Sequence, residues 1–221
     1  MAVPPPRSRH AYGYAAHEAG KRGRRALAPV RRHDAASPRR APFQQMGKSD
    51  LRAAMRAARL AFPPVRLPVF SEFVAGLRSR LIVASYRPMP GEADPEPLAR
   101  AAAAAGCALA LPRVEGRGRP LRFLRWEEDM TFAPGPFGIE QPPAEAKEVV
   151  PDLVLTPLVA FDRGGRRLGQ GVGYYDGAFA ALPDAWRVGV AWSVQEVACV
   201  PTEPWDVPLH AITTEKEWIT P

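Results

Sequence analysis

The chain of 221 residues is long enough for one domain with a sizeable buried core. Its hydrophobic content of 46% and charged content of 24% are those of an ordinary globular protein, which excludes a fibrous or a wholly disordered chain. The net charge is +7, but residues 1–46 hold ten Lys or Arg and only two acidic residues. The remainder of the chain is therefore close to neutral, and the charge is poor evidence for nucleic-acid binding.

Residues 1–46 are rich in Pro, Arg and Ala and show no hydrophobic period. Such a segment buries too little apolar surface to offset the entropy of ordering it. Its longest apolar stretch, residues 26–30, is too short for a signal-peptide core or a membrane span. An Arg-rich, acid-poor leader also resembles an organelle transit peptide, although this one has only two serines. We expect a disordered basic extension over residues 1–46 and a single domain over residues 47–221, in a cytoplasmic protein.

Helical and strand patterns alternate through the rest of the chain. Leu51, Met55 and Ala58 recur at helical spacing and predict an amphipathic first helix, which a pair of prolines ends. In chain order we expect a helix over 48–62, a helix over 67–79, a strand over 81–84, a helix over 96–105, strands over 108–111 and 121–126, a loop over 127–150, a strand over 153–155, a helix over 174–182 and a strand over 188–192. This order predicts an α/β fold, three-layer and Rossmann-like, with a mostly parallel sheet and helices on both faces.

The densest chemical signal is the segment 161–176, FDRGGRRLGQGVGYYD, which follows a predicted strand and leads into a predicted helix. Its five glycines allow successive backbone N–H groups to point at an anion, and a helix start adds partial positive charge. Arg163, Arg166 and Arg167 are candidate phosphate ligands, and Asp176 is a candidate Mg²⁺ ligand. The segment is neither a Walker loop nor a GxGxxG motif, so a basic surface turn is the alternative interpretation.

The first predicted helix carries a row of positive charge. Its basic residues recur at spacings of four, four and three and share one face; they are Lys48, Arg52, Arg56 and Arg59. Like charges at this spacing repel each other, and an anion bound across Lys48 and Arg52 would relieve the repulsion. A solvated basic face is the alternative.

Two carboxylates complete the set of candidates. Glu92 lies just after the first predicted core strand, where ligands bind in open α/β sheets, and it is placed to accept hydrogen bonds from a polar heterocycle. Asp206, near the C-terminus, is a candidate second metal ligand. Taken alone, each is better explained as an ordinary turn residue. His210 is the only histidine outside the basic extension, which disfavours a nucleophilic triad and a zinc site. The isolated Cys107 and Cys199 are expected to be buried thiols that stay reduced in the cytosol.

In these residues the chain resembles the 5-formyltetrahydrofolate cyclo-ligase family. The family pattern FDxxGxRLGxGxGYYD coincides with residues 161–176. Shorter matches occur in the same order along the chain, at Lys48-x-x-Leu51-Arg52, Gly91-Glu92-x-Asp94, residues 111–113, residues 137–139, Gln195 and residues 206–208. The resemblance covers roughly residues 47–215, and the long central motif is its most specific part.

The resemblance implies an enzyme whose catalytic domain is residues 47–221 and which converts 5-formyltetrahydrofolate and ATP to 5,10-methenyltetrahydrofolate, ADP and phosphate. It also implies that Lys48 and Arg52 contact ATP phosphates and that Asp176 and Asp206 hold Mg²⁺. The nucleotide would be wrapped by Arg167, Leu168, Gly169, Gln170, Gly171, Val172, Gly173, Tyr174 and Tyr175. Arg167 and Tyr174 are the implied catalytic residues, and the folate would meet Met89, Glu92 and Tyr174. Folate and ATP are the expected partners of a monomer that binds neither nucleic acid nor membrane.

Two positions depart from the family pattern. Val172 stands where the family commonly has Lys or Gly, and Gln170 stands where Arg or Tyr is frequent. A lost Lys removes one phosphate contact. The alternative function is therefore a cyclo-ligase-like protein that binds folate or nucleotide without this turnover.

Overall fold

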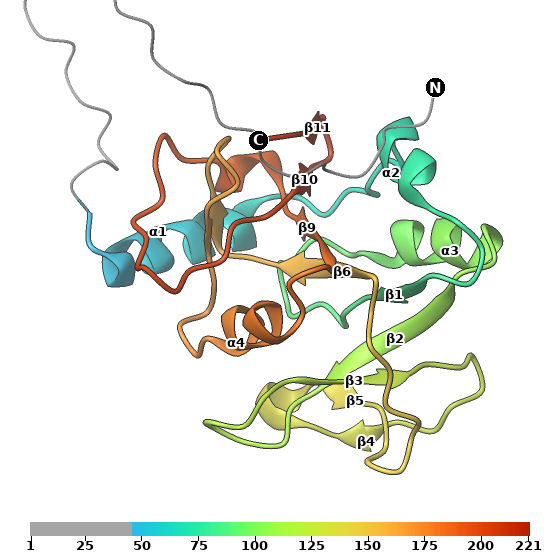
Figure 1. Ribbon diagram of the computed structural model, residues 1–221. Helices are drawn as coiled ribbons and strands as arrows, with labels where there is room; N and C mark the ends of the chain where they lie inside the picture. Colours follow the sequence, from blue (N-terminus) through green and yellow to red (C-terminus); the bar gives the residue numbers. More distant parts are fainter. Residues whose placement is uncertain (1–45) are drawn as a thin grey trace, which may run out of the picture. The chain divides into compact units, whose positions relative to one another are not determined.

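A seven-stranded sheet forms the centre of the computed structural model, which describes residues 46–221 (Figure 1). The expectations for the basic extension lie outside these described residues. The strand order is β11-β10-β9-β6-β1-β2-β3. The strands are β1 (Ile82–Ala84), β2 (Ala108–Arg113), β3 (Arg122–Arg125), β6 (Leu153–Pro157), β9 (Trp186–Val190), β10 (Ala211–Thr213) and β11 (Trp218–Ile219). The five central strands are parallel, and β3 and β11 are antiparallel edges, so the predicted mostly parallel sheet is confirmed.

The sheet has a reversal of strand order between β1 and β6. After β1 the chain adds β2 and β3 on one side, then crosses to β6 and continues through β9 and β10 on the other side. In an open α/β sheet, a crevice for ligands forms at this switch point, beyond the carboxyl ends of the strands.

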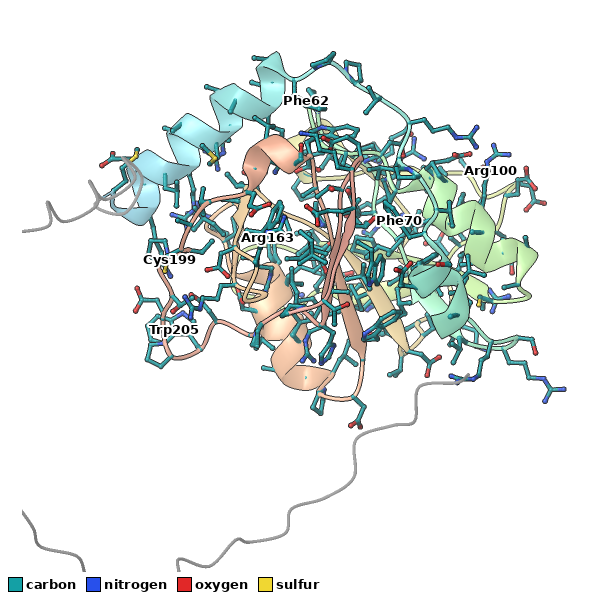
Figure 2. The ribbon with its side chains drawn as sticks, turned by 90° about the horizontal axis from the view of Figure 1, so that it is seen from above. Phe62, Phe70, Arg100, Arg163, Cys199 and Trp205 are labelled. Atoms are coloured by element: carbon teal, nitrogen blue, oxygen red, sulfur yellow. The ribbon has the colours of Figure 1, made fainter. Side chains whose placement is uncertain are left out.

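Helices cover both faces of the sheet, as predicted. On one face, α2 (Ser71–Gly76) and α3 (Glu96–Ala104) bury Phe73 and Leu98 in a core that includes Val83 of β1. On the opposite face, α4 (Tyr174–Ala181) buries Phe179. Figure 2, viewed along another direction, shows α3 and α2 on one side of the sheet and α4 on the other.

The first helix, α1 (Lys48–Ala61), does not cover the sheet. Its apolar face, which includes Leu51 and Met55, packs against the hairpin β7 (Ala160–Phe161) and β8 (Arg167–Leu168). It also contacts the short 3-10 helix η3 (Ser193–Gln195). The adjacent basic face is therefore held beside the glycine-rich segment.

Several predicted boundaries were wrong. Helix α2 is shorter than the predicted 67–79, because Pro68 disfavours a helical conformation at Leu67 and cannot donate a backbone hydrogen bond. Strand β2 continues through Pro112, which lies beyond the last residue pair with β1 and so needs no N–H toward that neighbour. Strand β9 begins two residues earlier than predicted and ends two residues earlier.

Short elements were missed. The predicted loop over residues 127–150 contains β4 (Ala133–Pro134), the 3-10 helix η2 (Pro136–Gly138) and β5 (Glu140–Gln141). Strands β7, β8, β10 and β11 were also not predicted. Elements of two or three residues are too short to show a hydrophobic period. Within residues 46–221, no helix combines the length and the apolar character required to cross a membrane.

Candidate active site

A first pocket of about 340 Å³ opens at the switch point of the sheet. Residues that follow β1, the end of β2 and the end of β6 form part of its wall, and the segment after β8 forms another part. Its lining includes Tyr86, Met89, Glu92, Leu111, Pro112, Ile139, Pro157, Arg167, residues 169–170 and residues 172–176. The structure thus brings Met89 and Glu92 into one cavity with Tyr174, which is far from them in the sequence.

Glu92 is a buried, charged group on the wall of this pocket. Its side chain is 4% exposed and forms an ion pair with Arg59, with Nη1 3.1 Å from Oε1. Its Oε2 accepts a hydrogen bond from the backbone N of Met89 at 3.0 Å, across a turn in which Gly91 has φ of 79°. Arg59 also donates to the carbonyl of Leu158. Arg59, expected on the anion-binding face of α1, is instead the partner of Glu92.

Two tyrosines, the buried Tyr86 and the partly buried Tyr175, line the same pocket as this carboxylate. Tyr86 donates its hydroxyl hydrogen to the carbonyl of Ala93, and this residue was missed by the sequence interpretation although it lies two residues after β1. Burial raises the pKa of both Tyr86 and Tyr175, and the charge of Glu92 raises both further. Both phenols are therefore neutral hydrogen-bonding groups at physiological pH.

The basic side chains of α1 bond to acceptors of the protein itself, although Arg56 remains exposed. Arg52 Nε donates to the carbonyl of Gly169 at 2.9 Å, and Arg56 donates to the side chain and carbonyl of Gln170. Lys48 pairs with Asp206 at 2.9 Å. The protein's own acceptors relieve the repulsion along the helix and attach α1 to the glycine-rich segment.

We call residues 169–173 the glycine loop. Gly171 has φ of 100° and Gly173 has φ of 79°, a region that residues with a Cβ rarely adopt. Gly173 is the N-cap of α4, so the loop ends where backbone N–H groups are unpaired. Val172 is exposed and contributes no charge. Leu168, just before the loop, is buried in the core beneath α1 and offers its carbonyl to Val159, so its side chain serves packing.

Arg167 lies between two cavities. A second pocket of about 300 Å³ is lined by residues 164, 166 and 167 and by residues 202–203 and 206–208, and the Arg167 side chain borders both pockets. Arg167 pairs with Asp176, donates to the carbonyl of Val207, and lies over the Phe179 ring at 4.8 Å. Burial lowers the pKa of Arg167, and Asp176 partly offsets this effect. The guanidinium is held rigidly at the junction of two cavities.

Asp176 and Asp206 approach the same short segment. The backbone N of Val207 donates to Asp176 Oδ1 at 3.4 Å, and Asp206 is the residue before it. Burial by itself raises the pKa of the Asp206 carboxyl. Hydrogen bonds from the Glu203 amide and from Lys48 outweigh that effect, so the pKa of Asp206 is lowered overall. Within residues 46–221, no three His, Cys, Asp or Glu side chains cluster to hold a metal ion. A pair of carboxylates fits Mg²⁺ bound jointly by protein and phosphate oxygens, since this ion usually takes few protein ligands.

Other candidates take structural positions. Arg163 is exposed and pairs with Glu196 and Glu217, so it is not a phosphate ligand of either pocket. The buried amide of Gln195 bonds to the carbonyls of Leu158 and Val159. Trp205, beside Asp206, lies at the periphery of the molecule and is 69% exposed (Figure 2).

His210 and Arg166 also have local partners. His210 contacts Arg187, and its pKa is lowered first by burial and then by that guanidinium. It borders neither pocket. Cys199, expected to be buried, is exposed and accepts a hydrogen bond from Arg166. Arg166 borders the second pocket and lies 3.5 Å from the buried Asp162, whose carboxylate also accepts from the Gly164 amide.

Replacing Glu92 by Gln is expected to destabilise the fold by about 2–3 kcal/mol, because the buried guanidinium of Arg59 loses its charged partner. Urea denaturation would measure the change. The double variant Arg59→Met, Glu92→Gln should recover part of the loss, since it removes the unpaired charge. Glu72→Gln, on the exposed first turn of α2, should change stability by less than about 0.5 kcal/mol. Equal effects of Glu92→Gln and Glu72→Gln would contradict the assignment of a buried pair.

The sequence of this chain is similar to those of known proteins. The family model described as the 5-formyltetrahydrofolate cyclo-ligase family matches residues 70–215. A protein of Haemophilus influenzae named 5-formyltetrahydrofolate cyclo-ligase is 41% identical over 102 residues, a match that covers 42% of this chain and 52% of that one. The match thus spans about half the length of that relative. A protein of the same name from Escherichia coli is 34% identical over 148 residues, covering 62% of this chain and 79% of that one.

Solved structures show the same architecture. The NMR structure of Aquifex aeolicus 5,10-methenyltetrahydrofolate synthetase superposes with a TM-score of 0.64 at 32% identity, and covers 79% of this chain and 93% of that chain. A 5,10-methenyltetrahydrofolate synthetase from Mycoplasma pneumoniae superposes with a TM-score of 0.58, covers 77% of this chain and 100% of that chain, and at 23% identity supports the fold alone.

Proposed function

The chain belongs to the 5-formyltetrahydrofolate cyclo-ligase family, and from this membership we propose that it converts 5-formyltetrahydrofolate and ATP to 5,10-methenyltetrahydrofolate, ADP and phosphate. The observation that carries the proposal is the position of Arg167, which borders both pockets. A ligand in each pocket would meet the other at a single guanidinium. A cytoplasmic location and a monomeric state remain predictions.

The proposed folate site is the first pocket. Leu111, Pro112 and Ile139 offer apolar walls for the flat pterin and aryl groups, and Met89 lines the same cavity. Glu92 is placed to accept hydrogen bonds from the pterin N–H groups. The formyl group would then lie toward Tyr174 and Arg167, which belong to the glycine-rich segment and line the same pocket.

The proposed nucleotide site is the glycine loop with the second pocket. The N-terminus of α4 and the backbone N–H groups of the loop favour phosphate oxygens. Lys48 and Arg52 lie beside this segment, since Arg52 contacts Gly169 and Lys48 contacts Asp206. Both cations would need to exchange part of these internal contacts for phosphate oxygens.

The chemistry requires charge neutralisation more than a protein nucleophile. The formyl oxygen is a poor leaving group until it attacks the γ-phosphate of ATP and expels ADP, which forms an imidoyl phosphate. The folate N10 then adds to the formyl carbon, loses its proton, and phosphate departs with the former formyl oxygen. Phosphoryl transfer depends on positioning and electrostatic stabilisation, and Arg167 lies where the phosphoryl group would pass.

Asp176 and Asp206 would hold Mg²⁺, which when bound would neutralise phosphate charge and so favour phosphoryl transfer. These carboxylates pair with Arg167 and Lys48. The two ion pairs hold the carboxylates in place, and both would exchange partners when the nucleotide and the metal bind.

The decisive experiment incubates the purified protein with 5-formyltetrahydrofolate, ATP and Mg²⁺ and follows methenyltetrahydrofolate by its near-ultraviolet absorption. We expect product only when all three are present, and none after EDTA is added. If the protein binds Mg²⁺-ATP and the folate but forms no product, the proposed activity is wrong and the non-catalytic binding alternative holds. That alternative rests on Val172, which leaves the glycine loop without a cation.

A further inference from the structure

The carboxylate of Glu92 is nearly saturated before any ligand enters. Oε1 accepts from Arg59 at 3.1 Å and from the Gln170 side-chain amide at 3.2 Å, and Oε2 accepts from the Met89 amide at 3.0 Å. A carboxylate offers about four acceptor positions, so about one remains. A ligand that donates two hydrogen bonds to Glu92 must therefore displace one of these three partners.

Gln170 is the partner most easily displaced. The Met89 amide belongs to the same turn as Glu92, and Arg59 is a buried charge that would be left unpaired. The Gln170 side chain is neutral, and its hydrogen bond to Glu92 is the longest of the three. Gln170 belongs to the glycine loop, a segment distant in sequence from Glu92. Its loss costs less than the loss of a charge-assisted bond.

The same amide also holds Arg56. Gln170 Oε1 accepts from Arg56 Nε at 3.0 Å and Nη2 at 2.7 Å, and the Gln170 carbonyl accepts from Nη2 at 3.2 Å. The side chain of Gln170 thus connects Glu92 to Arg56, and all three border the first pocket. Because Gln170 is neutral, the charge of Arg56 is held in position without being neutralised.

The glycine loop itself has no positive side chain, since the sequence contains no Lys or Arg between Arg167 and Asp176. Positive charge beside the loop therefore has to come from α1. Arg52 donates to Gly169, and Arg56 is the next basic residue along the same face, one turn further. A phosphate on the loop lies within reach of a guanidinium that is already bonded to Gln170.

We propose that Gln170 is a positioning residue that makes Arg56 available to the nucleotide when Glu92 is occupied. A ligand with two adjacent N–H donors, as in a pterin, takes the place of the Gln170 amide on Glu92. The displaced Gln170 side chain no longer directs its own Oε1 at Arg56. The guanidinium of Arg56 is then free to bind nucleotide phosphate. The inference rests on the proposed function, because it requires a folate in the first pocket and ATP on the loop.

The consequence is positive coupling between the two substrates, which must be reciprocal in their binding constants. Isothermal titration calorimetry with AMP-PNP, which permits no phosphoryl transfer, would measure it with and without 5-formyltetrahydrofolate. We expect the folate to tighten AMP-PNP binding by about 5- to 20-fold in the unaltered protein. p-Aminobenzoylglutamate, which lacks the pterin donors, should give no tightening.

Two variants are expected to abolish the coupling in opposite ways. In Gln170→Met, Arg56 keeps its bond to the backbone carbonyl of residue 170 but is otherwise free. AMP-PNP should then bind without folate about as tightly as it binds the unaltered protein with folate. In Arg56→Met, binding should be weak in both conditions. Arg66→Met, an exposed arginine beyond the end of α1, is the matched control and should retain full coupling. Thermal unfolding of each variant would verify that it is folded.

Coupling that persists unchanged in Gln170→Met, or its absence from an unaltered protein that forms product, would overturn this inference while leaving the proposed activity standing. A protein that binds neither AMP-PNP nor the folate would overturn both. Loss of product formation with the coupling intact would overturn the proposed activity alone.

Discussion

Replacement of Arg167 by Met is expected to reduce kcat/KM for methenyltetrahydrofolate formation by at least about a thousandfold. The guanidinium is 4% exposed and borders both pockets, so it lies where charge develops during phosphoryl transfer. Arg167→Lys should lose about a hundredfold, because an ammonium cannot keep the bonds to Asp176 and the Val207 carbonyl while contacting phosphate. Steady-state kinetics with both substrates would give the separate effects on kcat and KM.

The matched control for this prediction is Arg163→Met. Arg163 belongs to the same motif, but its guanidinium pairs with Glu196 and Glu217 on the exposed side of the turn. We expect its kcat/KM to remain within about twofold of the unaltered value. If Arg163→Met and Arg167→Met lose activity equally, or if Arg167→Met stays within tenfold, Arg167 is not at the reacting centre. Thermal unfolding would separate a catalytic loss from a folding defect.

Replacement of Asp176 by Asn is expected to lower kcat by about a hundredfold to a thousandfold while the protein remains folded. Asn has the same shape and can still accept the hydrogen bond from Arg167, but it removes the charge proposed to bind Mg²⁺. The Mg²⁺ concentration that gives half-maximal rate should therefore rise. Manganese binding to the nucleotide-loaded protein, followed by electron paramagnetic resonance, should weaken in parallel and does not depend on turnover.

Asp184→Asn is the corresponding control, since Asp184 is exposed just beyond the other end of α4. Its kinetics and its manganese affinity should be unchanged. An Asp176→Asn variant with normal manganese affinity but low kcat would mean that Asp176 acts only by positioning Arg167. An unchanged kcat would remove Asp176 from the site altogether.

Local patterns in the sequence were sufficient for the main elements and for the centre of the site. A helix over 48–62 was predicted because its apolar residues recur at helical spacing, and α1 ends one residue earlier. The glycine-rich segment was recognised because its residues are contiguous. Arg167, Tyr174 and Asp176 come from that one segment and do border the first pocket. The helix boundary at α2 and the short strands were missed, since a single proline or a two-residue pairing leaves no periodic signal.

By itself the sequence determined the α/β class, the family resemblance and the identity of the glycine loop, because each depends on residues that are neighbours along the chain. Only the tertiary structure decided the partners of the charged groups. Lys48 reaches Asp206 and Arg59 reaches Glu92 because α1 packs on the β7–β8 hairpin beside the carboxyl ends of the strands. The basic face of α1, which resembled an anion site, is therefore committed to protein acceptors. A phosphate ligand would have to displace part of these internal contacts at Lys48, Arg52 and Arg56, which lie beside the glycine loop because segments far apart in the sequence pack together.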